Sequence, residues 1–221
     1  MIEVKDVSKT FGSLKVLRRL SVSFQPGEVV LLVGANGAGK STLLKILAGL
    51  SRADSGEVVS KASKVNFLSH HLFLYSRLSV RENLKLFGSV QGVRSIDEVV
   101  RSLELGEVLD RPVSELSKGN QAKVGIARVL LGAPEVLLLD EPTSNLDEKG
   151  TALLLSALSQ LQDATNGQTL TLLATHDLHR LAPVATRVIV LSGGEVISDS
   201  GPRASRETVA QAVERYREVN R

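Results

Sequence analysis

The chain has 221 residues, of which 43% are hydrophobic and 23% charged, with a formal net charge of +3 at pH 7. This balance excludes a disordered chain and fits one α/β domain, and scattered Lys and Arg residues with few aromatics argue against nucleic-acid binding. The absence of cysteine excludes disulfides, zinc–thiolate sites and thiol catalysis. Without a membrane-length apolar run or a signal-peptide pattern, we expect a soluble, cytoplasmic chain.

The first part of the chain predicts strands around one glycine-rich loop. Alternating side chains predict an edge strand at residues 2–7, and a second strand follows at 16–24. Residues 29–33 are all apolar, which is typical of a strand buried on both faces. A helix then extends to about residue 50, before short strands at 57–59 and 65–68.

The hydrophobic period then changes from that of strands to that of helices. Ser79 and Ser95 are each followed three residues later by Glu, which is the capping-box pattern of a helix start. Ser117 has the position of a third helix cap. We therefore expect residues 72–131 to form a mostly helical insert.

Strands and helices alternate again after the insert. Strands are predicted at 136–139 and 169–174, with an amphipathic helix between them and a short helix after them. A hairpin across Gly193-Gly194 follows. The tail, residues 205–220, has one apolar helical face, which we expect to pack on the domain, with a partner interface as the alternative.

One loop joins the buried strand at 29–33 to the next helix, with the spacing G-x-x-x-x-G-K-S: Gly34-Ala35-Asn36-Gly37-Ala38-Gly39-Lys40-Ser41-Thr42. Its backbone N–H groups and the positive helix end would hold phosphate oxygens. Lys40 would reach the β- and γ-phosphates of ATP, and the Ser41 hydroxyl would bind Mg²⁺. An ordinary glycine-rich turn would not explain why loop, strand and helix all agree.

Two carboxylates, Asp140 and Glu141, directly follow the apolar strand at 136–139. Ligands bind at the carboxyl ends of strands in open α/β sheets. Asp140 would hold Mg²⁺ through water, and Glu141 would orient or deprotonate the water that attacks the γ-phosphate. An acid pair that only starts a helix is the alternative, which the presence of Lys40 disfavours.

A further loop, Leu116-Ser117-Lys118-Gly119-Asn120-Gln121, resembles the signature L-S-G-G-Q of ATP-binding cassette (ABC) ATPases. Phe11, the glycine-rich loop, the strand with Asp140 and Glu141, Ser144-Asn145-Leu146-Asp147 and Ala174-Thr175-His176-Asp177 follow the family's order. The resemblance, which covers residues 2 to about 200, implies that Phe11 stacks on adenine. It also implies that Asp147 belongs to a loop linking two sites of a dimer, and that His176 senses the γ-phosphate.

The resemblance implies a P-loop NTPase core of ABC type, residues 1–71 and 132–221, with an N-terminal antiparallel β subdomain and the helical insert. It also implies a head-to-tail dimer in which Ser117 and Gly119 of one subunit close on the γ-phosphate held by Lys40 of the other. Lys118 and Asn120 depart from the signature, but Ser117 and Gly119 are kept, so we expect closure to survive.

His70 stands where the family usually has Gln, by gap-free counting. A Gln carbonyl suits Mg²⁺, whereas imidazole is a poor ligand for it and can carry a charge. Residues 69–84 resemble the ATPase subunit of haem exporters used in cytochrome c maturation. We expect His70 to lie beside the γ-phosphate and Mg²⁺; alternatively it points away and only shapes the loop. His179 could pair with His176 on a metal, although a surface histidine is the favoured interpretation.

The leading functional hypothesis is the ATP-hydrolysing motor subunit of an ABC transporter, peripheral on the inner face of the membrane. Its partners would be a second ABC ATPase, identical or pseudo-symmetric, and an integral membrane subunit docked on the helical insert. A soluble ABC ATPase of DNA repair or translation is the alternative, disfavoured by the short insert and the single cassette. A degenerate module without hydrolysis is disfavoured by intact Lys40, Asp140, Glu141 and His176.

Overall fold

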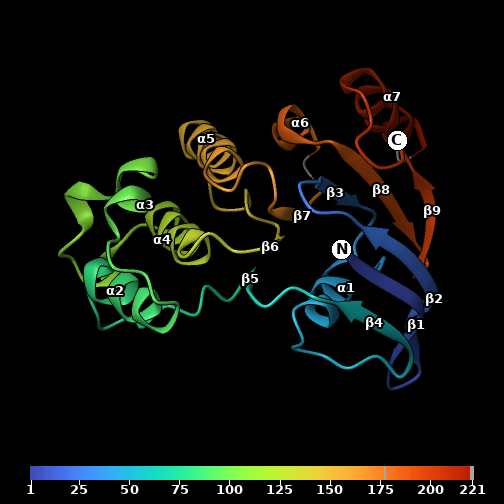
Figure 1. Ribbon diagram of the computed structural model, residues 1–221, viewed down its shortest axis with the longest axis horizontal. Coiled ribbons are helices and arrows are strands. Elements are labelled where there is room, and N and C mark those ends of the chain that lie inside the picture. Colours follow the sequence, from blue (N-terminus) through green and yellow to red (C-terminus); the bar gives the residue numbers. More distant parts are fainter. Residues whose placement is uncertain (177, 220–221) are drawn as a thin grey trace.

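The strands form two sheets in the computed structural model, which describes residues 1–176 and 178–219 (Figure 1). A three-stranded antiparallel sheet has the order β2-β1-β4, and its strands are β2 (Leu14–Phe24), β1 (Ile2–Phe11) and β4 (Ser55–Ser60). A six-stranded sheet has the order β5-β6-β7-β3-β8-β9. Its strands are β5 (Val65–Leu68), β6 (Val136–Asp140), β7 (Leu170–Ala174), β3 (Val29–Val33), β8 (Arg187–Ser192) and β9 (Glu195–Asp199). The expected P-loop NTPase architecture with an antiparallel β subdomain is confirmed.

Strand β1 is the centre of the small sheet, so the prediction of an edge strand at residues 2–7 is wrong. Val4 lies opposite Val22 of β2 and opposite Val58 of β4. The alternating pattern reports which side chains face the core, and Ile2 and Val4 are indeed buried. It carries no information about how many neighbours pair with the strand's backbone.

Strand β3 shows why the larger sheet is covered on both faces. Val29, Leu31 and Val33 belong to a core cluster shared with the helices, whereas Val30 and Leu32 belong to a second cluster. That second cluster also contains buried residues of the small sheet and of helix α1 (Lys40–Leu47). Because all five side chains are buried, the expected two-sided burial of this strand is confirmed.

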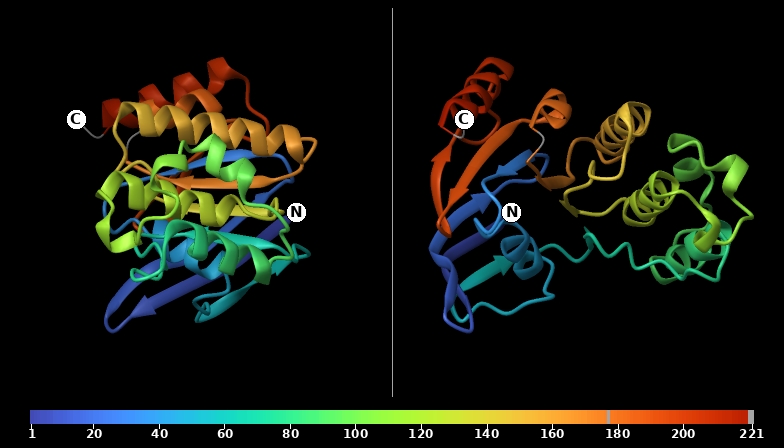
Figure 2. Two further views of the ribbon diagram at one scale, coloured as in Figure 1. Left: turned by 90° about the vertical axis from the view of Figure 1, so that its left-hand side faces the viewer. Right: turned by 180° about the vertical axis from the view of Figure 1, so that it is seen from behind.

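The helices gather beyond the far end of the larger sheet and over one of its faces (Figures 1 and 2). They are α2 (Val80–Val90), α3 (Asp97–Ser102), α4 (Lys118–Leu130), α5 (Glu148–Ala164), α6 (Leu178–Leu181) and α7 (Arg206–Val219), with 3₁₀ turns at Gly106–Val108, Val113–Glu115 and Ala182–Val184. Asp177 and Asn220, which the sequence patterns included, lie outside the described residues. Among the described helices, none combines the length and apolar character needed to cross a membrane.

One of the two predicted capping boxes forms, and the other does not. Ser79 accepts from the backbone N–H of Glu82 at 3.2 Å, and the Glu82 carboxylate accepts from the Ser79 N–H at 2.8 Å. At the second start, Ser95 instead accepts from the N–H of Asp97, at 3.1 Å, and donates to the Asp97 carboxylate, at 2.7 Å. The Asp97 carboxylate, two residues after Ser95, therefore replaces the predicted contact with Glu98.

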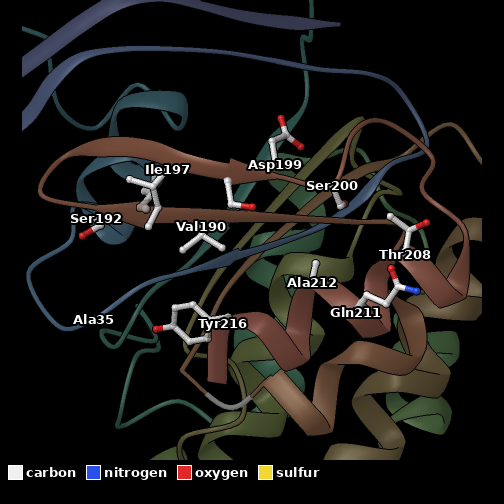
Figure 3. Close-up of a pocket in the computed structure, with 12 residues that line it drawn as sticks. Ala35, Val190, Ser192, Ile197, Asp199, Ser200, Thr208, Gln211, Ala212 and Tyr216 are labelled. Atoms are coloured by element: carbon white, nitrogen blue, oxygen red, sulfur yellow. The ribbon is translucent and has the colours of Figure 1, made fainter. Parts of the chain in front are cut away.

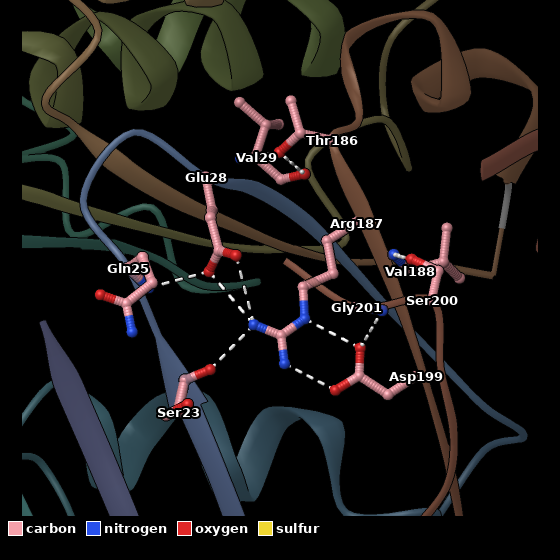
Figure 4. Close-up of polar contacts among 10 residues, drawn as sticks. All are labelled: Ser23, Gln25, Glu28, Val29, Thr186, Arg187, Val188, Asp199, Ser200 and Gly201. Carbon is pink, nitrogen blue, oxygen red and sulfur yellow. Dashed lines mark hydrogen bonds and ion pairs between the residues drawn. The ribbon is translucent and has the colours of Figure 1, made fainter. Parts of the chain in front are cut away.

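A buried arginine joins the two sheets' edges (Figure 4). The side chain of Arg187 on β8 makes a bidentate pair with Asp199 of β9, at 2.8 and 2.6 Å. On its other side it lies 3.2 Å from the Glu28 carboxylate and 2.8 Å from the Ser23 carbonyl. Hydrogen bonding to Asp199 raises the pKa of Arg187. The guanidinium therefore stays protonated and neutralises the fully buried Glu28 carboxylate.

We expect Arg187→Ala to lower the free energy of unfolding by about 3–5 kcal/mol, because it leaves the Glu28 carboxylate buried without its cation. Urea denaturation would measure the loss. Arg19→Ala is the matched control, since Arg19 forms an exposed pair with Asp6 and should cost about 1 kcal/mol or less. Similar losses in both variants would show that burial of the pair is irrelevant.

Candidate functional site

The glycine-rich loop turns sharply between the end of β3 and the start of α1. Gly39, the residue before the helix, has φ +106°, and a Cβ there would lie 2.6 Å from a Leu17 methyl group. Glycine is therefore required by the backbone conformation, and Leu17 would have to shift to admit a side chain. A cavity of about 510 Å³ opens beside this loop, lined by Leu14, Val16, Asn36, Gly37, Ala38, Gly39, Lys40, Ser41, Thr42, His70, Glu141, Ser144 and His176.

Lys40 places a buried ammonium group inside the loop. Its Nζ donates to the carbonyl oxygens of Gly34, at 2.7 Å, and Ala35, at 3.3 Å. Burial lowers the pKa of Lys40, while the carboxylates of Glu141 and Asp140 act in the opposite direction. The ammonium group donates to these two carbonyls here. When a phosphate enters the cavity, the same N–H donors can bond to its oxygens instead.

Ser41 and Asp140 meet although 99 positions separate them in the chain. The Ser41 hydroxyl donates to the Asp140 carboxylate at 2.9 Å, and Asp140 is buried. A hydroxyl and a carboxylate oxygen side by side are the hard donors that Mg²⁺ prefers. No group of three or more His, Cys, Asp or Glu side chains able to hold a metal occurs within the described residues. A Mg²⁺ here would therefore complete its shell with water and phosphate oxygens.

Glu141 and His176 form the polar wall of the cavity. The chain leaves β6 in a left-handed conformation at Glu141, with φ +52°, while its N–H donates to the Ala174 carbonyl at 2.9 Å. Non-glycine residues in this conformation cost roughly 1–3 kcal/mol and are concentrated at functional sites. The Glu141 carboxylate lies 2.8 Å from Nδ1 of His176. The histidine is 69% exposed and the glutamate 11%, so the pair lies at the mouth of the cavity.

The other residues predicted from sequence divide between the cavity and its surroundings. His70 lines the same cavity as Lys40 and Glu141, on an exposed stretch after β5. Phe11 is 54% exposed, lies under the Lys9 ammonium, and is not among the lining residues. Leu14, which lies opposite Phe11 in the β1–β2 register, lines the cavity instead. Contact between Phe11 and adenine thus stays a prediction.

The signature residues line a second cavity, of about 320 Å³, whose lining contains none of the glycine-rich loop. Ser117 begins α4 and accepts from the Asn120 N–H at 3.2 Å, as its capping role predicts. Asp147 begins α5 and accepts from the Gly150 N–H at 2.6 Å. Both line this cavity together with Gly119. Within one chain, these residues and Lys40 therefore face different cavities.

Three lining residues of the first cavity were missed by the sequence analysis. Ser144 belonged to a motif assigned to dimer contacts only, and its place directly after Glu141-Pro142-Thr143 could have indicated the cavity. Leu14 and Val16 sit at the start of β2, where only the hairpin register brings them to the loop. His179, by contrast, is exposed on α6, in agreement with a surface histidine.

Comparison with known protein families decides the relationship that these motifs indicate. The sequence profile described as ABC transporter matches residues 17–144, more than half of the chain. The chain belongs to the ABC transporter family. This ABC domain is 33% identical to the sulfate/thiosulfate import ATP-binding protein CysA of Methylococcus capsulatus, over 88% of the chain and 61% of the relative.

Other relatives of the ABC domain have different named roles. The spermidine/putrescine import ATP-binding protein PotA of Legionella pneumophila is 31% identical over 95% of the chain and 62% of its own length. The macrolide export ATP-binding/permease protein MacB of Campylobacter jejuni is 33% identical over 94% of the chain and 35% of its own length. The chain thus spans less than two thirds of these relatives, whose names include both importers and an exporter.

Solved structures give the same family at the level of the fold. A dimeric ATP-binding cassette in a post-hydrolysis state, bound to ADP and Pi, superposes with a TM-score of 0.82 at 26% identity, over 93% of this chain and all of that one. The ATP-binding subunit of an ABC transporter gives 0.83 at 25% identity, over 97% and 99%. The expected ABC family and fold are confirmed, whereas these relatives' names give no support to the finer resemblance to haem exporters.

Proposed function

We propose that this chain binds ATP with Mg²⁺ and hydrolyses it as the motor subunit of an ABC transporter. The observation that carries the proposal is one cavity shared by Lys40, the bonded pair Ser41–Asp140, and the pair Glu141–His176. Calorimetric titration of ATP with and without Mg²⁺, followed by an assay for released phosphate, tests it. Binding without phosphate release would reduce the chain to a nucleotide-binding module.

Each polar group has a distinct part in the proposed reaction. Lys40 and the loop N–H groups bind the β- and γ-phosphates. The Glu141 carboxylate takes a proton from a water molecule as the water oxygen bonds to the γ-phosphorus, and the bond from that phosphorus to the β-phosphate oxygen breaks. His176 orients Glu141 or the γ-phosphate from the cavity mouth. Mg²⁺, held at Ser41 and Asp140, would neutralise phosphate charge.

We also propose that two cassettes pair head to tail, so that Ser117 and Gly119 of one meet the γ-phosphate held by the other. Two observations support this arrangement. The signature residues line a cavity separate from that of Lys40, and their position at the start of α4 offers N–H groups and a positive helix end to an anion. A structurally similar cassette bound to ADP and Pi is itself dimeric.

The helical insert offers a surface on which a membrane subunit would dock. That subunit, and not this chain, would bind the transported substrate. Large hydrophobic side chains are exposed in and around α2, namely Phe73, Tyr75, Leu86 and Val90. We propose that these side chains contribute to a docking surface for a membrane subunit. A role in haem export stays a prediction that rests on His70 and on residues 69–84, and the named relatives favour no single substrate.

His70 supplies a test of the unusual position beside the phosphates. A neutral imidazole can accept a hydrogen bond from water, whereas its cation cannot. We expect His70→Gln, which supplies the amide usual at this position, to keep turnover, and His70→Ala, which leaves no acceptor there, to lower it. Phosphate-release assays on the three proteins measure the difference. Equal turnover in all three would show that His70 only shapes the loop.

A further inference from the structure

A third cavity adjoins the glycine-rich loop at Ala35 and shares no lining residue with the proposed phosphate cavity. It has a volume of about 400 Å³ and is bounded by the hairpin of β8 and β9 and by helix α7 (Figure 3). Its lining includes Ala35 from the loop and Tyr216 from α7. Helix α7 and the loop therefore line the same cavity. Neither the family motifs nor the proposed reaction uses this arrangement.

Tyr216 touches the loop through its hydroxyl group. Burial raises the pKa of Tyr216, and a hydrogen bond with the backbone of Gly34 acts in the opposite direction, as an N–H donor to the phenol oxygen does. Figure 3 shows the ring beneath β8, with its hydroxyl directed toward the segment at Ala35.

Helix α7 is anchored well enough to hold that hydroxyl in place. Val209 and Val213, one helical turn apart, are 3% and 5% exposed and belong to the main core cluster. Tyr216 follows on the same face and packs partly against this cluster. At the other end, the Ser205 hydroxyl accepts from the Thr208 N–H at 3.1 Å. The tyrosine is thus presented by a docked helix, not by a free tail.

Gly34 is the first residue of the loop after β3, and three groups meet there. Its carbonyl accepts from Lys40 Nζ at 2.7 Å. A Cβ on Gly34 would lie 2.4 Å from the Leu191 carbonyl, which shows how closely β8 approaches. The Tyr216 hydroxyl is the third group. The direction in which the following N–H groups point is set where the loop leaves β3, and Tyr216 acts at that residue.

We propose that Tyr216 is a positioning residue that fixes Gly34, and through it the phosphate-binding loop, so that docking of α7 tunes the affinity for nucleotide. The inference rests on the proposed ATP-binding function. Without the hydroxyl, the loop has more conformations to lose when the phosphates bind, which weakens binding. Glu141 and His176 are untouched, so the chemical step should not change.

The test compares Tyr216→Phe with Gln211→Ala, which removes a side chain from the same helix and the same cavity. We expect the dissociation constant for ATP–Mg²⁺ and KM to rise about three- to tenfold in Tyr216→Phe, the effect of one net hydrogen bond. We expect kcat to stay the same, and Gln211→Ala to match wild type throughout. Thermal melting of nucleotide-free Tyr216→Phe should show a midpoint lowered by only about 2–4 °C, because one hydrogen bond is lost while the phenyl ring keeps its packing.

The outcomes separate this inference from the function on which it rests. If Lys40→Ala loses ATP binding but Tyr216→Phe binds as wild type does, Tyr216 only packs and the inference is wrong. If Tyr216→Phe changes kcat and the melting midpoint but not KM, its role is structural and the inference is equally overturned. If Lys40→Ala binds ATP like wild type, the proposed phosphate site itself fails.

Discussion

Lys40→Ala is expected to raise the dissociation constant for ATP–Mg²⁺ at least about a hundredfold. The substitution removes the buried ammonium that now donates to Gly34 and Ala35 and that would donate to two phosphate groups instead. Hydrogen bonds to charged groups contribute roughly 1.5–3 kcal/mol each, and two of them correspond to a hundredfold or more in affinity. Isothermal titration calorimetry on the purified chain measures the change.

Lys45→Ala provides the matched control for this result. Lys45 lies on the same helix, α1, but is exposed and absent from the cavity lining. It should bind ATP as wild type does, because its charge faces solvent, where screening weakens its reach to the phosphates. ATP affinity in Lys40→Ala close to that of wild type would remove the phosphate-loop assignment, and an equal loss in Lys45→Ala would point to a general charge effect.

Glu141→Gln is expected to bind ATP nearly as wild type does while hydrolysing it about 10²–10⁴ times more slowly, the usual contribution of a general base. The amide has almost the same shape as the carboxylate but cannot take a proton from water. Lys40 and the Ser41–Asp140 pair are unaltered, so the phosphate-binding groups stay in place. Single-turnover phosphate release, together with equilibrium binding, separates the two effects.

Glu195→Gln, which neutralises an exposed acid on β9, controls for the change of net charge and should turn over at the wild-type rate. Turnover close to wild type in Glu141→Gln would assign the base elsewhere. A loss of binding parallel to the loss of turnover would instead show that the Glu141 carboxylate acts chiefly on the cation or on the fold.

The centre of the site could be predicted from sequence because its parts are defined by local chain geometry. A buried strand, a glycine-rich turn and a helix predict the positions of Lys40 and Ser41 at the start of the helix, and both residues line the cavity. Asp140 could be brought to Ser41 because parallel strands end at one edge of a sheet, and the structure joins the two at 2.9 Å. Gly37 and Gly39 follow from the left-handed backbone of the turn, with φ of +83° and +106°.

The features that sequence analysis missed depend on packing between distant segments. The central place of β1 depends on pairing with β4, some fifty residues away. Leu14 enters the cavity through a hairpin register that side-chain alternation does not determine. In the sequence, Tyr216 is only one apolar residue of an amphipathic tail. A helical pattern of apolar residues does not predict which loop the tyrosine hydroxyl will contact.

The central claim, a site completed by a second cassette, is tested most directly by multi-angle light scattering of Glu141→Gln. We predict a mass near 23.7 kDa without nucleotide and about twice that mass with saturating ATP. Adding Ser117→Arg, which should block contact with the partner's γ-phosphate, should return the ATP-bound protein to the mass of one chain. A Glu141→Gln protein that binds ATP and keeps the mass of one chain, or a dimer unaffected by Ser117→Arg, would contradict the account.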